Sequence, residues 1–594
     1  MRLSDQQRKA VQYPESAFIE ASPGSGKTRT LTAKLIDLLD SVRGTPRKIA
    51  CITYTNAAVH EIENRVRKYE RNDDEFSYEV ATIHSFCLTN VLGPYYWKLQ
   101  EYKTGYEILP SDSDEYDEIA RKICTRHSLN YNWDVKRAFE QLGRHKDGSP
   151  IAPYPLDTQN SAVYDFWDEL ERLGYIDFTN IVYCSYRLVS RHSEIAKSVA
   201  SKYAWILVDE FQDTTALQFE VLSRIADAAI TKFFLVGDPN QSIFGFAGAT
   251  PEAMYDFSDR VQADSRFALN HNWRSSSNIV DEAESLIPRS PTMVAVGENR
   301  DFEFAPYRRH FGSAYEAIAD HFLPLLEHYD IPYGDAAILA PWWTALYGIG
   351  KRLSADGVPI VGPGARPYRR SRYLFARFAE RICEYIETRE PHLIPLLERE
   401  LFILVRDLTG QPNFRVFSYS GRRIVMELVK RMGSDIDSDA LATTWLQVAV
   451  QSMREVLEGE ELIQKSHGDL LSQSVNDMIK EIRNNKNTRD RPDSQLKVRD
   501  LAIFASYSKN IKLLTFHGAK GLEFDAVALI DMHEGKIPHF SINYKSYDEQ
   551  QRMLEESKRV FYVGITRAKR LLMYFTDDSD TRNPPSRLLS LVEN

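Results

Sequence analysis

Residues 17–28, AFIEASPGSGKT, are the stretch around which the first part of the chain is organised. Residues 17–21 are largely apolar and predict a short buried strand, and residues 22–26 form a glycine-rich turn. Lys27 then opens a helical segment that continues as TRTLTAKLIDLLD. A glycine-rich turn between a strand and a helix is the context in which such a sequence binds phosphate. The stretch therefore predicts an α/β domain with a phosphate-binding loop.

This loop supplies several kinds of phosphate contact. Gly24 and Gly26 let the backbone bend so that its N–H groups converge on the phosphates, and the helix N-terminus adds a positive dipole end. Lys27 brings a positive charge to the phosphates, and the Thr28 hydroxyl can bind Mg²⁺. The expected nucleotide-binding residues are Ala21, Ser22, Pro23, Gly24, Ser25, Gly26, Lys27, Thr28 and Arg29. The alternative, a glycine-rich turn before an ordinary amphipathic helix, is disfavoured because Gly-Lys-Thr follows the strand in register.

Length and charge limit the class of protein. At 594 residues the chain is too long for one core, and length alone suggests roughly four domains. Its 43% hydrophobic and 27% charged residues are typical of a soluble globular protein. The formal net charge is −10, so a nucleic-acid partner would require a local basic groove.

The cysteines and apolar runs indicate a cytoplasmic protein. Five cysteines, without a CxxC pair, argue against a zinc or iron–sulfur site and favour a reducing compartment: Cys51, Cys87, Cys124, Cys184 and Cys383. The polar start MRLSDQQRKAVQ does not predict a signal peptide. The longest apolar runs, such as AAILAPWW (336–343), are too short to span a membrane, so no membrane partner is expected.

Buried strands and polar strand ends alternate in the first half of the chain. Strands are expected at 48–54, 79–83, 203–208 and 232–236, and the pattern is interrupted by a helical insertion at 89–175. Polar and aromatic residues follow the strand ends, where open parallel sheets bind ligands. We therefore expect the functional side chains at this edge.

Two carboxylates follow the strand at 203–208. Asp209 can hold Mg²⁺, and Glu210 can polarise the attacking water. A solvated acidic loop is the alternative, and the buried strand before the acids disfavours it. Gln241 is placed to sense a γ-phosphate or its water, and Arg274 is a candidate phosphate contact.

Aromatic residues supply candidate stacking faces. Phe244 and Phe246 follow the strand at 232–236, and Trp273 precedes Arg274. Each of these signals alone is weak, because an isolated tryptophan more often lies in a core.

A second α/β pattern follows and is also interrupted. It begins with a strand AAILA (336–340), a helix ALYGIGKRLSADG (345–357) and a strand VPIVG (358–362). The predicted first domain comprises 1–88 and 176–275 around the insertion 89–175, and the second comprises 276–375 and 506–594 around a helical insertion at 376–505. Arg567 is a candidate arginine finger, with a surface arginine as the alternative. RRSR (369–372) fits either a phosphate contact or a solvated turn, and we favour the turn. The segment after the last strand is too short for a fused nuclease domain.

Nine ordered segments together resemble the superfamily 1 helicases of the UvrD/Rep/PcrA type. They are LSDQQ (3–7), ASPGSGKT (21–28), TYTNAAVHEIENRV (53–66), ATIHSFC (81–87), LVDEFQDT (207–214), VGDPNQSIFGFAGA (236–249), LNHNWRSS (269–276), LLTFHGAKGLEFD (513–525) and EESKRVFYVGITRAKR (555–570). IDFTNIV (176–182) resembles the segment that leads back into the first core domain. The resemblance implies two RecA-like domains, each with a helical insertion.

The same resemblance assigns roles to residues. It implies that ATP is held by Gln7, Lys27, Thr28, Trp273 and Glu523. It implies that Thr28 and Asp209 take Mg²⁺, that Glu210 is the base, and that Gln241, Arg274 and Arg567 couple to the γ-phosphate. The implied contacts to single-stranded DNA are Tyr54, Thr55, Asn56, His84, Phe244, Phe246, Thr515 and His517. Stacking accepts any base, so no sequence specificity is expected.

The chain departs from the family pattern in places. Ala21 stands where the first loop glycine is usual, and Phe246-Ala247-Gly248 lacks the arginine that usually follows the aromatic residue. Both helical insertions are short for the family.

The leading interpretation is an ATP-dependent 3′→5′ translocase or helicase acting on single-stranded or tailed duplex DNA. A second hypothesis is a DNA- or nucleotide-sensing ATPase subunit that feeds a separate nuclease or a repair or defence protein, as in compact two-gene phage-defence systems such as Gabija. A P-loop kinase or generic NTPase leaves the last two segments, 513–525 and 555–570, unexplained.

Overall fold

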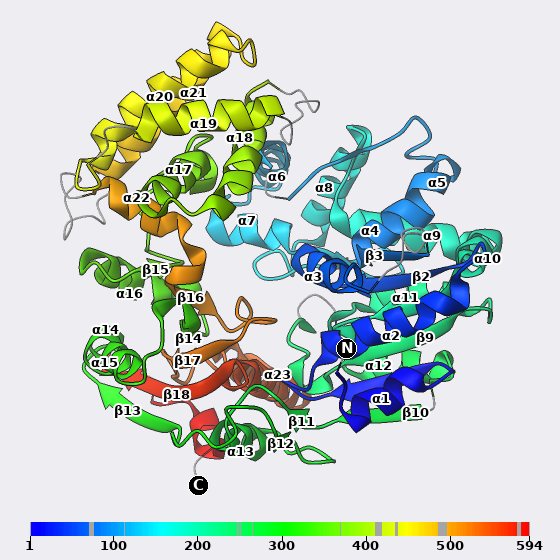
Figure 1. Ribbon diagram of the computed structural model, residues 1–594. Coiled ribbons are helices and arrows are strands. Elements are labelled where there is room, and N and C mark those ends of the chain that lie inside the picture. Colours follow the sequence, from blue (N-terminus) through cyan, green and yellow to red (C-terminus); the bar gives the residue numbers. More distant parts are fainter. Residues whose placement is uncertain are drawn as a thin grey trace. The chain divides into compact units, whose positions relative to one another are not determined.

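The computed structural model describes residues 2–69, 77–111, 113–245, 249, 251–263, 265–368, 370–409, 419–433, 437–484, 496–578 and 584–592. The chain forms two compact units. The first comprises Met1–Phe302 with Lys558–Tyr562, and the second comprises Glu303–Ser557 with Val563–Asn594. Each unit contains a parallel sheet flanked by helices, as the alternation of strands and helices predicts (Figure 1).

The first unit is built on a six-stranded parallel sheet with the strand order β10-β1-β9-β8-β2-β3. Its strands are β1 (Ala17–Ala21), β2 (Lys48–Thr53), β3 (Tyr78–Thr82), β8 (Tyr203–Val208), β9 (Lys232–Gly237) and β10 (Ser265–Leu269). β1 lies inside the sheet, where Ile19 pairs with Phe267 of β10 and Val236 of β9. Burial on both faces explains the continuous apolar runs in these strands.

Helices cover this sheet and carry its loops. They are α1 (Asp5–Gln12), α2 (Lys27–Val42), α3 (Asn56–Val66), α4 (Ile83–Cys87), α9 (Phe178–Arg191), α10 (Ser193–Lys202), α11 (Ala216–Ala226), α12 (Pro251–Arg260) and α13 (Ser277–Leu286). Capping residues in the sequence determine where several of these helices begin. Ser4 and Gln7 form a capping box at α1, and the Asp177 side chain caps α9 by accepting the N–H of Asn180.

The first helical insertion has its own core. It contains α6 (Asp114–Arg126), α7 (Trp133–Glu140) and α8 (Asn160–Arg172), with the short strand pairs β4 (Glu107–Ile108) with β7 (Tyr175–Ile176) and β5 (Gly143–Arg144) with β6 (Pro150–Ile151). The separate core begins at Leu109, whereas Leu92 and Leu99 pack into the core of the main sheet. Residues 89–102 therefore support the first sheet, although the sequence predicts an insertion from residue 89.

The second unit contains another six-stranded parallel sheet, in the order β13-β18-β17-β14-β16-β15. Its strands are β13 (Tyr307–Phe311), β14 (Ala336–Ala340), β15 (Ile360–Val361), β16 (Ile511–Thr515), β17 (Phe524–Leu529) and β18 (Ala568–Asp577). Its flanking helices are α14 (Ala314–Ala317), α15 (Leu323–His328), α16 (Trp343–Ala355) and α23 (Tyr547–Ile565). The sequence analysis predicts the β14–α16–β15 unit.

The second helical insertion projects from this unit (Figure 1, green through yellow to orange). Its helices are α17 (Ala376–Thr388), α18 (Ile394–Thr409), α19 (Tyr419–Gly433), α20 (Ala442–Gly459), α21 (Lys465–Asn484) and α22 (Val498–Ala505). They share one hydrophobic core that extends from Tyr368 to Phe504.

The basic segment before α17 is only partly solvated: Arg372 is exposed, but Arg370 has a buried partner. Within it, Arg370 pairs with the buried carboxylate of Glu380 at 3.0 Å. Arg366 binds the same carboxylate at 2.8 Å, and the Tyr368 hydroxyl donates to it at 2.9 Å. Arg369 lies outside the described residues. The favoured solvated interpretation is therefore wrong for Arg370, because a buried acid needs cationic partners.

The first unit extends to Phe302, beyond the predicted boundary at residue 275. The reason is that the chain after residue 275 packs back onto this unit. The short strands β11 (His271–Asn272) and β12 (Val294–Ala295) pair in parallel, and buried residues of α13 include Ile279 and Val280. The amino-acid composition after residue 275 does not predict that the chain packs on the first unit.

All five cysteines are buried and unbridged. In the part of the chain that the structure describes, no helix combines the length and apolar character required to cross a bilayer.

Candidate functional site

The phosphate-binding loop joins β1 to α2 and requires glycine at two positions. Gly24 has φ +68° and Gly26 has φ +84°. A Cβ at Gly24 would lie 2.8 Å from Asn272 Oδ1, and one at Gly26 would lie 2.7 Å from Gln7 Nε2. Both residues thus combine a left-handed backbone with close approach of a neighbouring amide.

Lys27 and Thr28 begin α2 at this loop. The Lys27 ammonium donates to the Ala21 carbonyl at 3.4 Å and so lies across the loop. The Thr28 hydroxyl donates to Asp209 Oδ2 at 3.1 Å, which brings the two predicted Mg²⁺ ligands together. Arg29, in contrast, is exposed on α2.

Gln7 is fixed beside the same loop. Its Oε1 accepts the N–H of Ser4 at 2.9 Å, and its Nε2 donates to the Ser25 carbonyl at 2.9 Å. An amide can make four hydrogen bonds, so one donor and one acceptor position remain for the ATP that the family resemblance assigns to Gln7.

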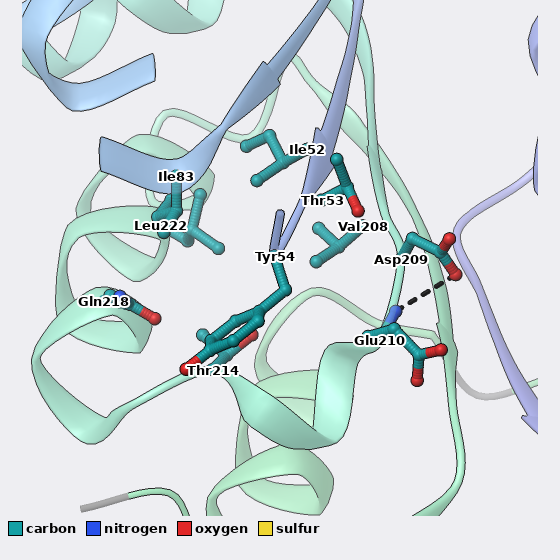
Figure 2. A pocket seen from close by; sticks show the side chains of 10 residues that line it. All are labelled: Ile52, Thr53, Tyr54, Ile83, Val208, Asp209, Glu210, Thr214, Gln218 and Leu222. Atoms are coloured by element: carbon teal, nitrogen blue, oxygen red, sulfur yellow. Dashed lines mark hydrogen bonds between the residues drawn. The ribbon is translucent and has the colours of Figure 1, made fainter. Parts of the chain in front are cut away.

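The acidic pair Asp209–Glu210 follows β8 directly (Figure 2). Asp209 is buried, and burial together with the charge of Glu210 raises its pKa to about 7. The Glu210 N–H donates to Asp209 Oδ1 at 3.0 Å. Glu210 itself has φ 47° and ψ 45°, a left-handed conformation that is unusual for glutamate and clusters at functional sites.

These residues fit a magnesium ion. Carboxylate and hydroxyl oxygens are the ligands that Mg²⁺ prefers, and a cation would favour the charged form of a buried carboxylate whose pKa is raised. Thr28 and Asp209 supply such a donor set at the end of β8 and the start of α2.

A continuous chain of hydrogen bonds connects Glu210 to Gln241. Gln212 Nε2 donates to Glu210 Oε2 at 2.5 Å, and Gln212 Oε1 accepts the N–H of Asp238 at 2.9 Å. Gln241 Nε2 then donates to Asp238 Oδ2 at 2.6 Å. The two ends of this chain are among the predicted site residues, whereas Gln212 and Asp238 are not. The available signal was that both lie in segments resembling the family, 207–214 and 236–249, and that Asp238 directly follows β9.

Trp273 and Arg274 are brought to the loop by a local turn. The N–H of Trp273 donates to the Gly24 carbonyl at 2.9 Å, and its side chain is half exposed. The buried Asn272 Oδ1 accepts the N–H groups of Arg274 at 2.7 Å and Ser275 at 2.8 Å. This arrangement leaves an aromatic face beside the phosphate loop.

Most of the predicted DNA-contact residues of the first unit gather around one pocket. The Tyr54 and Phe244 rings are stacked, with centroids 5.2 Å apart and planes at 22°. The adjacent pocket has a volume of about 370 Å³ and is lined by Tyr54, Thr55, Asn56, Thr82, His84, Ser85, Leu88, Phe178 and Ile181. Phe246, Ala247 and Gly248 lie outside the described residues.

Phe178 is an additional aromatic residue at this pocket. Its ring meets His84 edge-on at 5.8 Å and is 45% exposed, although it begins helix α9 next to a buried core. The sequence analysis treats the surrounding segment only as a connection. The available signal was an aromatic residue directly after the helix cap Asp177.

Tyr54 also borders the acidic pair. Figure 2 shows that one pocket is lined on one side by Tyr54 and on the other by Asp209 and Glu210. Burial and the charge of Asp213 raise the pKa of Tyr54 to about 12, so its hydroxyl stays protonated at neutral pH. Tyr54 of the stacked pair thus lines the same pocket as the two carboxylates.

The second unit has its own aromatic cluster beyond the ends of β14 and β16. Trp342 follows β14, and its ring lies 5.2 Å from that of His539. His539 lies 4.2 Å from Phe540, which is 56% exposed. Thr515, at the end of β16, accepts the N–H of Gly518 at 3.1 Å, and half-buried His517 follows it. Trp342, His539 and Phe540 are absent from the predicted contacts.

Arg567 and Glu523 lie next to each other in the second unit. Arg567 is buried, and its guanidinium donates to the carbonyls of Val563 and Leu522, both at 3.0 Å. The N–H of Phe524 donates to the Arg567 carbonyl at 2.9 Å, and Glu523 pairs with Lys569 at 3.3 Å. Both residues are therefore placed by the pairing of β17 and β18.

Comparison with protein families gives two matches. Residues 3–262 match the UvrD/REP helicase N-terminal domain, and residues 441–577 match the UvrD-like helicase C-terminal domain. The two matches fall on opposite halves of the chain.

Relatives align over nearly the whole chain. ATP-dependent DNA helicase Rep of Buchnera aphidicola is 24% identical, over 97% of this chain and 94% of its own length. DNA helicase II of Escherichia coli K12 is 24% identical, over 96% and 84%, and ATP-dependent DNA helicase PcrA of Staphylococcus aureus is 25% identical, over 100% and 87%. With both family models matched in order on a fold of two parallel sheets, the chain belongs to the UvrD-like superfamily 1 helicases, which are ATP-dependent DNA helicase enzymes.

Proposed function

We propose that this protein is an ATP-dependent 3′→5′ single-stranded DNA translocase that unwinds tailed duplexes. The observation that carries the proposal is a bonded series of side chains whose two carboxylates line a pocket with Tyr54, one ring of the stacked pair Tyr54–Phe244. The series comprises Thr28, Asp209, Glu210, Gln212, Asp238 and Gln241. A nucleotide site and a base-stacking surface are thereby built into one unit.

The nucleotide chemistry follows from the positions of the side chains. The loop N–H groups and Lys27 hold the phosphates, and Trp273 offers a stacking face for adenine. Glu210 orients and deprotonates the attacking water while Gln212 fixes its carboxylate. Gln241 lies at the far end of the same hydrogen-bond chain, where it responds to the γ-phosphate.

Thr28 and Asp209 are the residues that would hold Mg²⁺. The ion, when bound, neutralises charge on the phosphates during transfer. In the second unit, Arg567 would supply positive charge to the γ-phosphate and Glu523 would contact the ribose. Arg274 is the corresponding arginine in the first unit.

We further propose that DNA crosses both units. Bases would stack on Tyr54, Phe178 and Phe244 in the first unit and on the cluster Trp342, His539 and Phe540 in the second. The residues Thr55, Asn56, His84, Thr515 and His517 supply polar groups along this track. Cycles of ATP binding and hydrolysis would change how the two units hold the strand and so move it.

ATP is assigned to two core domains, each interrupted by a helical insertion. The sequence predicts the cores at 1–88 with 176–275 and at 276–375 with 506–594, around insertions at 89–175 and 376–505. The packing of residues 89–102 and 276–302 on the first unit favours adding them to the first core. The scattered cysteines, without a CxxC pair, make the cytoplasm the expected location.

The test is ATP-driven unwinding by the purified chain of 3′-tailed, 5′-tailed and blunt duplexes. Unwinding of the 3′-tailed duplex alone, lost in Lys27→Ala, supports the proposal. Unwinding with the opposite polarity, or full unwinding by Lys27→Ala, contradicts it. ATP hydrolysis stimulated by single strands without unwinding would instead support a sensing subunit that needs a nuclease partner.

A further inference from the structure

Arg289 forms a buried ion pair at the edge of the proposed ATP site. It lies in the loop after α13, and its Nη2 donates to Asp238 Oδ1. The side chains of Arg289 and Asp238 are 6% and 0% exposed. The Arg289 Nε donates to the hydroxyl of Tyr562 at 3.0 Å. One guanidinium therefore bridges the loop after β9 and a residue of helix α23.

The position of Arg289 is itself fixed. The Glu284 carboxylate accepts the N–H of Arg289 and the N–H of Met293, both at 3.0 Å. These two bonds tie the loop to the end of α13. The guanidinium is consequently held in place before any ligand binds.

Asp238 connects Arg289 to Gln241 through hydrogen bonds to both side chains. Its Oδ1 accepts Arg289 and also the N–H of Asn240 at 3.1 Å, while its Oδ2 accepts Gln241 Nε2 at 2.6 Å. Burial alone would raise the pKa of Asp238, but the charges of Arg289 and then Lys27 hold it below its ordinary value. The carboxylate thus stays an acceptor for both partners.

Helix α23 contacts the other end of the same loop. Arg559 Nε donates to the Ser242 carbonyl at 2.8 Å. Residues 558–562 belong to the first unit, although the helix before and after them belongs to the second. The loop 238–242 is therefore bonded to α23 directly at Ser242 and, through Arg289, at Asp238.

We propose that Arg289 is a positioning residue for ATP hydrolysis: through Asp238 it sets the orientation of Gln241, and through Tyr562 it makes that orientation depend on helix α23. This inference rests on the proposed function. A purely structural role would alter folding stability without a selective effect on turnover.

The kinetic test uses Arg289→Gln, Arg289→Lys and Tyr562→Phe in the full chain. We expect Arg289→Gln to lower kcat for DNA-stimulated ATP hydrolysis by about 10- to 100-fold, the loss expected for a small displacement of a catalytic group, with KM for ATP nearly unchanged. Arg289→Lys retains the charge but not the planar fork, so it should restore part of the rate, and Tyr562→Phe should give a smaller loss. The matched control is Arg260→Gln, which breaks an exposed Arg–Asp pair with Asp227 and should leave kcat unchanged.

A double-mutant cycle tests whether Arg289 affects kcat through Gln241 or independently of it. If Arg289 acts by orienting Gln241, adding Arg289→Gln to Gln241→Ala causes little further loss of kcat. Losses that multiply, or an unchanged kcat in Arg289→Gln, overturn the inference.

Hydrogen exchange provides a readout that does not depend on activity. The N–H groups of Gln241 and Ser242 bond back to Asp238 and Pro239 at 2.9 and 3.2 Å. We expect faster exchange across residues 238–242 and 558–562 in Arg289→Gln and in Tyr562→Phe than in the wild type. Unchanged exchange in both segments overturns the inference. A wild-type chain without DNA-stimulated hydrolysis refutes the proposed function, whereas the exchange result still decides whether Arg289 holds the loop.

Discussion

At the residue scale, the backbone conformation of Glu210 determines where its carboxylate lies. Its left-handed conformation directs its carboxylate toward Gln212 while its N–H caps Asp209. Such a conformation costs about 1–3 kcal/mol and persists only when its surroundings hold it. The β8 strand and the hydrogen bonds to Asp209 and Gln212 stabilise this left-handed conformation.

Replacing the carboxylate should separate ATP binding from hydrolysis. We expect Glu210→Gln to lower kcat by about 10²–10⁴-fold, the usual contribution of a general base, because the amide cannot accept the proton. ATP affinity, measured with a fluorescent analogue, should change little. Glu61→Gln, on the exposed surface of α3, is the control. Retention of full turnover in Glu210→Gln would remove Glu210 from the mechanism.

Phe178 provides a second test at this scale. Its exposed ring next to His84 should stack on a base, so Phe178→Ala should weaken single-strand binding by about 1–3 kcal/mol. The slope of affinity against salt concentration should stay the same, because no phosphate contact is removed. Tyr164→Ala, in the first helical insertion, is the control with a similarly exposed ring. Equal affinities of wild type and Phe178→Ala in a fluorescence titration would exclude the ring from the track.

At the element scale, a polar cluster joins β3, β8 and the helical turn at Leu88–Leu92. Glu79 accepts the Tyr203 hydroxyl at 2.5 Å and pairs with Lys202 at 3.3 Å, and Asn90 donates to the same carboxylate at 3.1 Å. Although burial raises the pKa of Glu79, these partners hold it below its ordinary value of 4.5. The cluster fastens the edge strand β3 to the rest of the sheet.

This pKa shift predicts an acid-dependent loss of stability. A carboxyl whose pKa is lower in the folded chain stabilises it fully above its unfolded pKa, and the contribution disappears as pH falls through the folded value. Glu79→Gln should therefore be less stable than wild type at pH 7, by about 1.5–3 kcal/mol for the lost charged hydrogen bonds. The difference should shrink below pH 4.5. Thermal unfolding monitored by circular dichroism measures it, and a difference that persists unchanged into acid would contradict the assignment.

Sequence patterns predict elements better than they predict where elements meet. The strand at 336–340 and the helical start at Lys27 are found where expected, because apolar runs and glycine turns are local signals. The packing of 276–302 on the first unit depends on partners far along the chain, and the pairing of Arg370 with the buried Glu380 depends on how α17 packs, which a charge pattern does not show. The same limit explains why Phe178 and Arg289 were missed as candidates: their partners, His84 and Asp238, are distant in sequence.

At the scale of the whole molecule, the proposed DNA track requires both units. If one strand contacts the aromatic cluster of each unit, Phe178→Ala and Trp342→Ala remove independent contacts. Their losses of binding free energy should then add in the double variant to within about 0.5 kcal/mol, because neither residue shares a partner with the other. Binding titrations with a strand long enough for both units measure the sum. An affinity unaffected by Trp342→Ala would confine the track to the first unit.

The two sheets also explain why the family can be identified at low identity. Relatives 24–25% identical align over at least 96% of this chain, and the resemblance of ordered segments in the sequence predicts the same family. Strand ends carry the matching segments, whereas the helical insertions have cores of their own and can vary independently. Polarity and partner choice depend on surfaces that sequence patterns do not specify.

The burial of all five cysteines has a practical consequence for testing the proposed ATP-driven change in how the two units hold the strand. Burial raises the pKa of each thiol, to about 12 for Cys87 and Cys184 and to about 11 for Cys124. Maleimide dyes react with accessible thiolates, so the native chain should remain unlabelled. A single new cysteine placed on the exposed face of each unit would then carry a donor and an acceptor fluorophore without removing any natural cysteine. Energy transfer between them would record each ATP cycle in one molecule at a time.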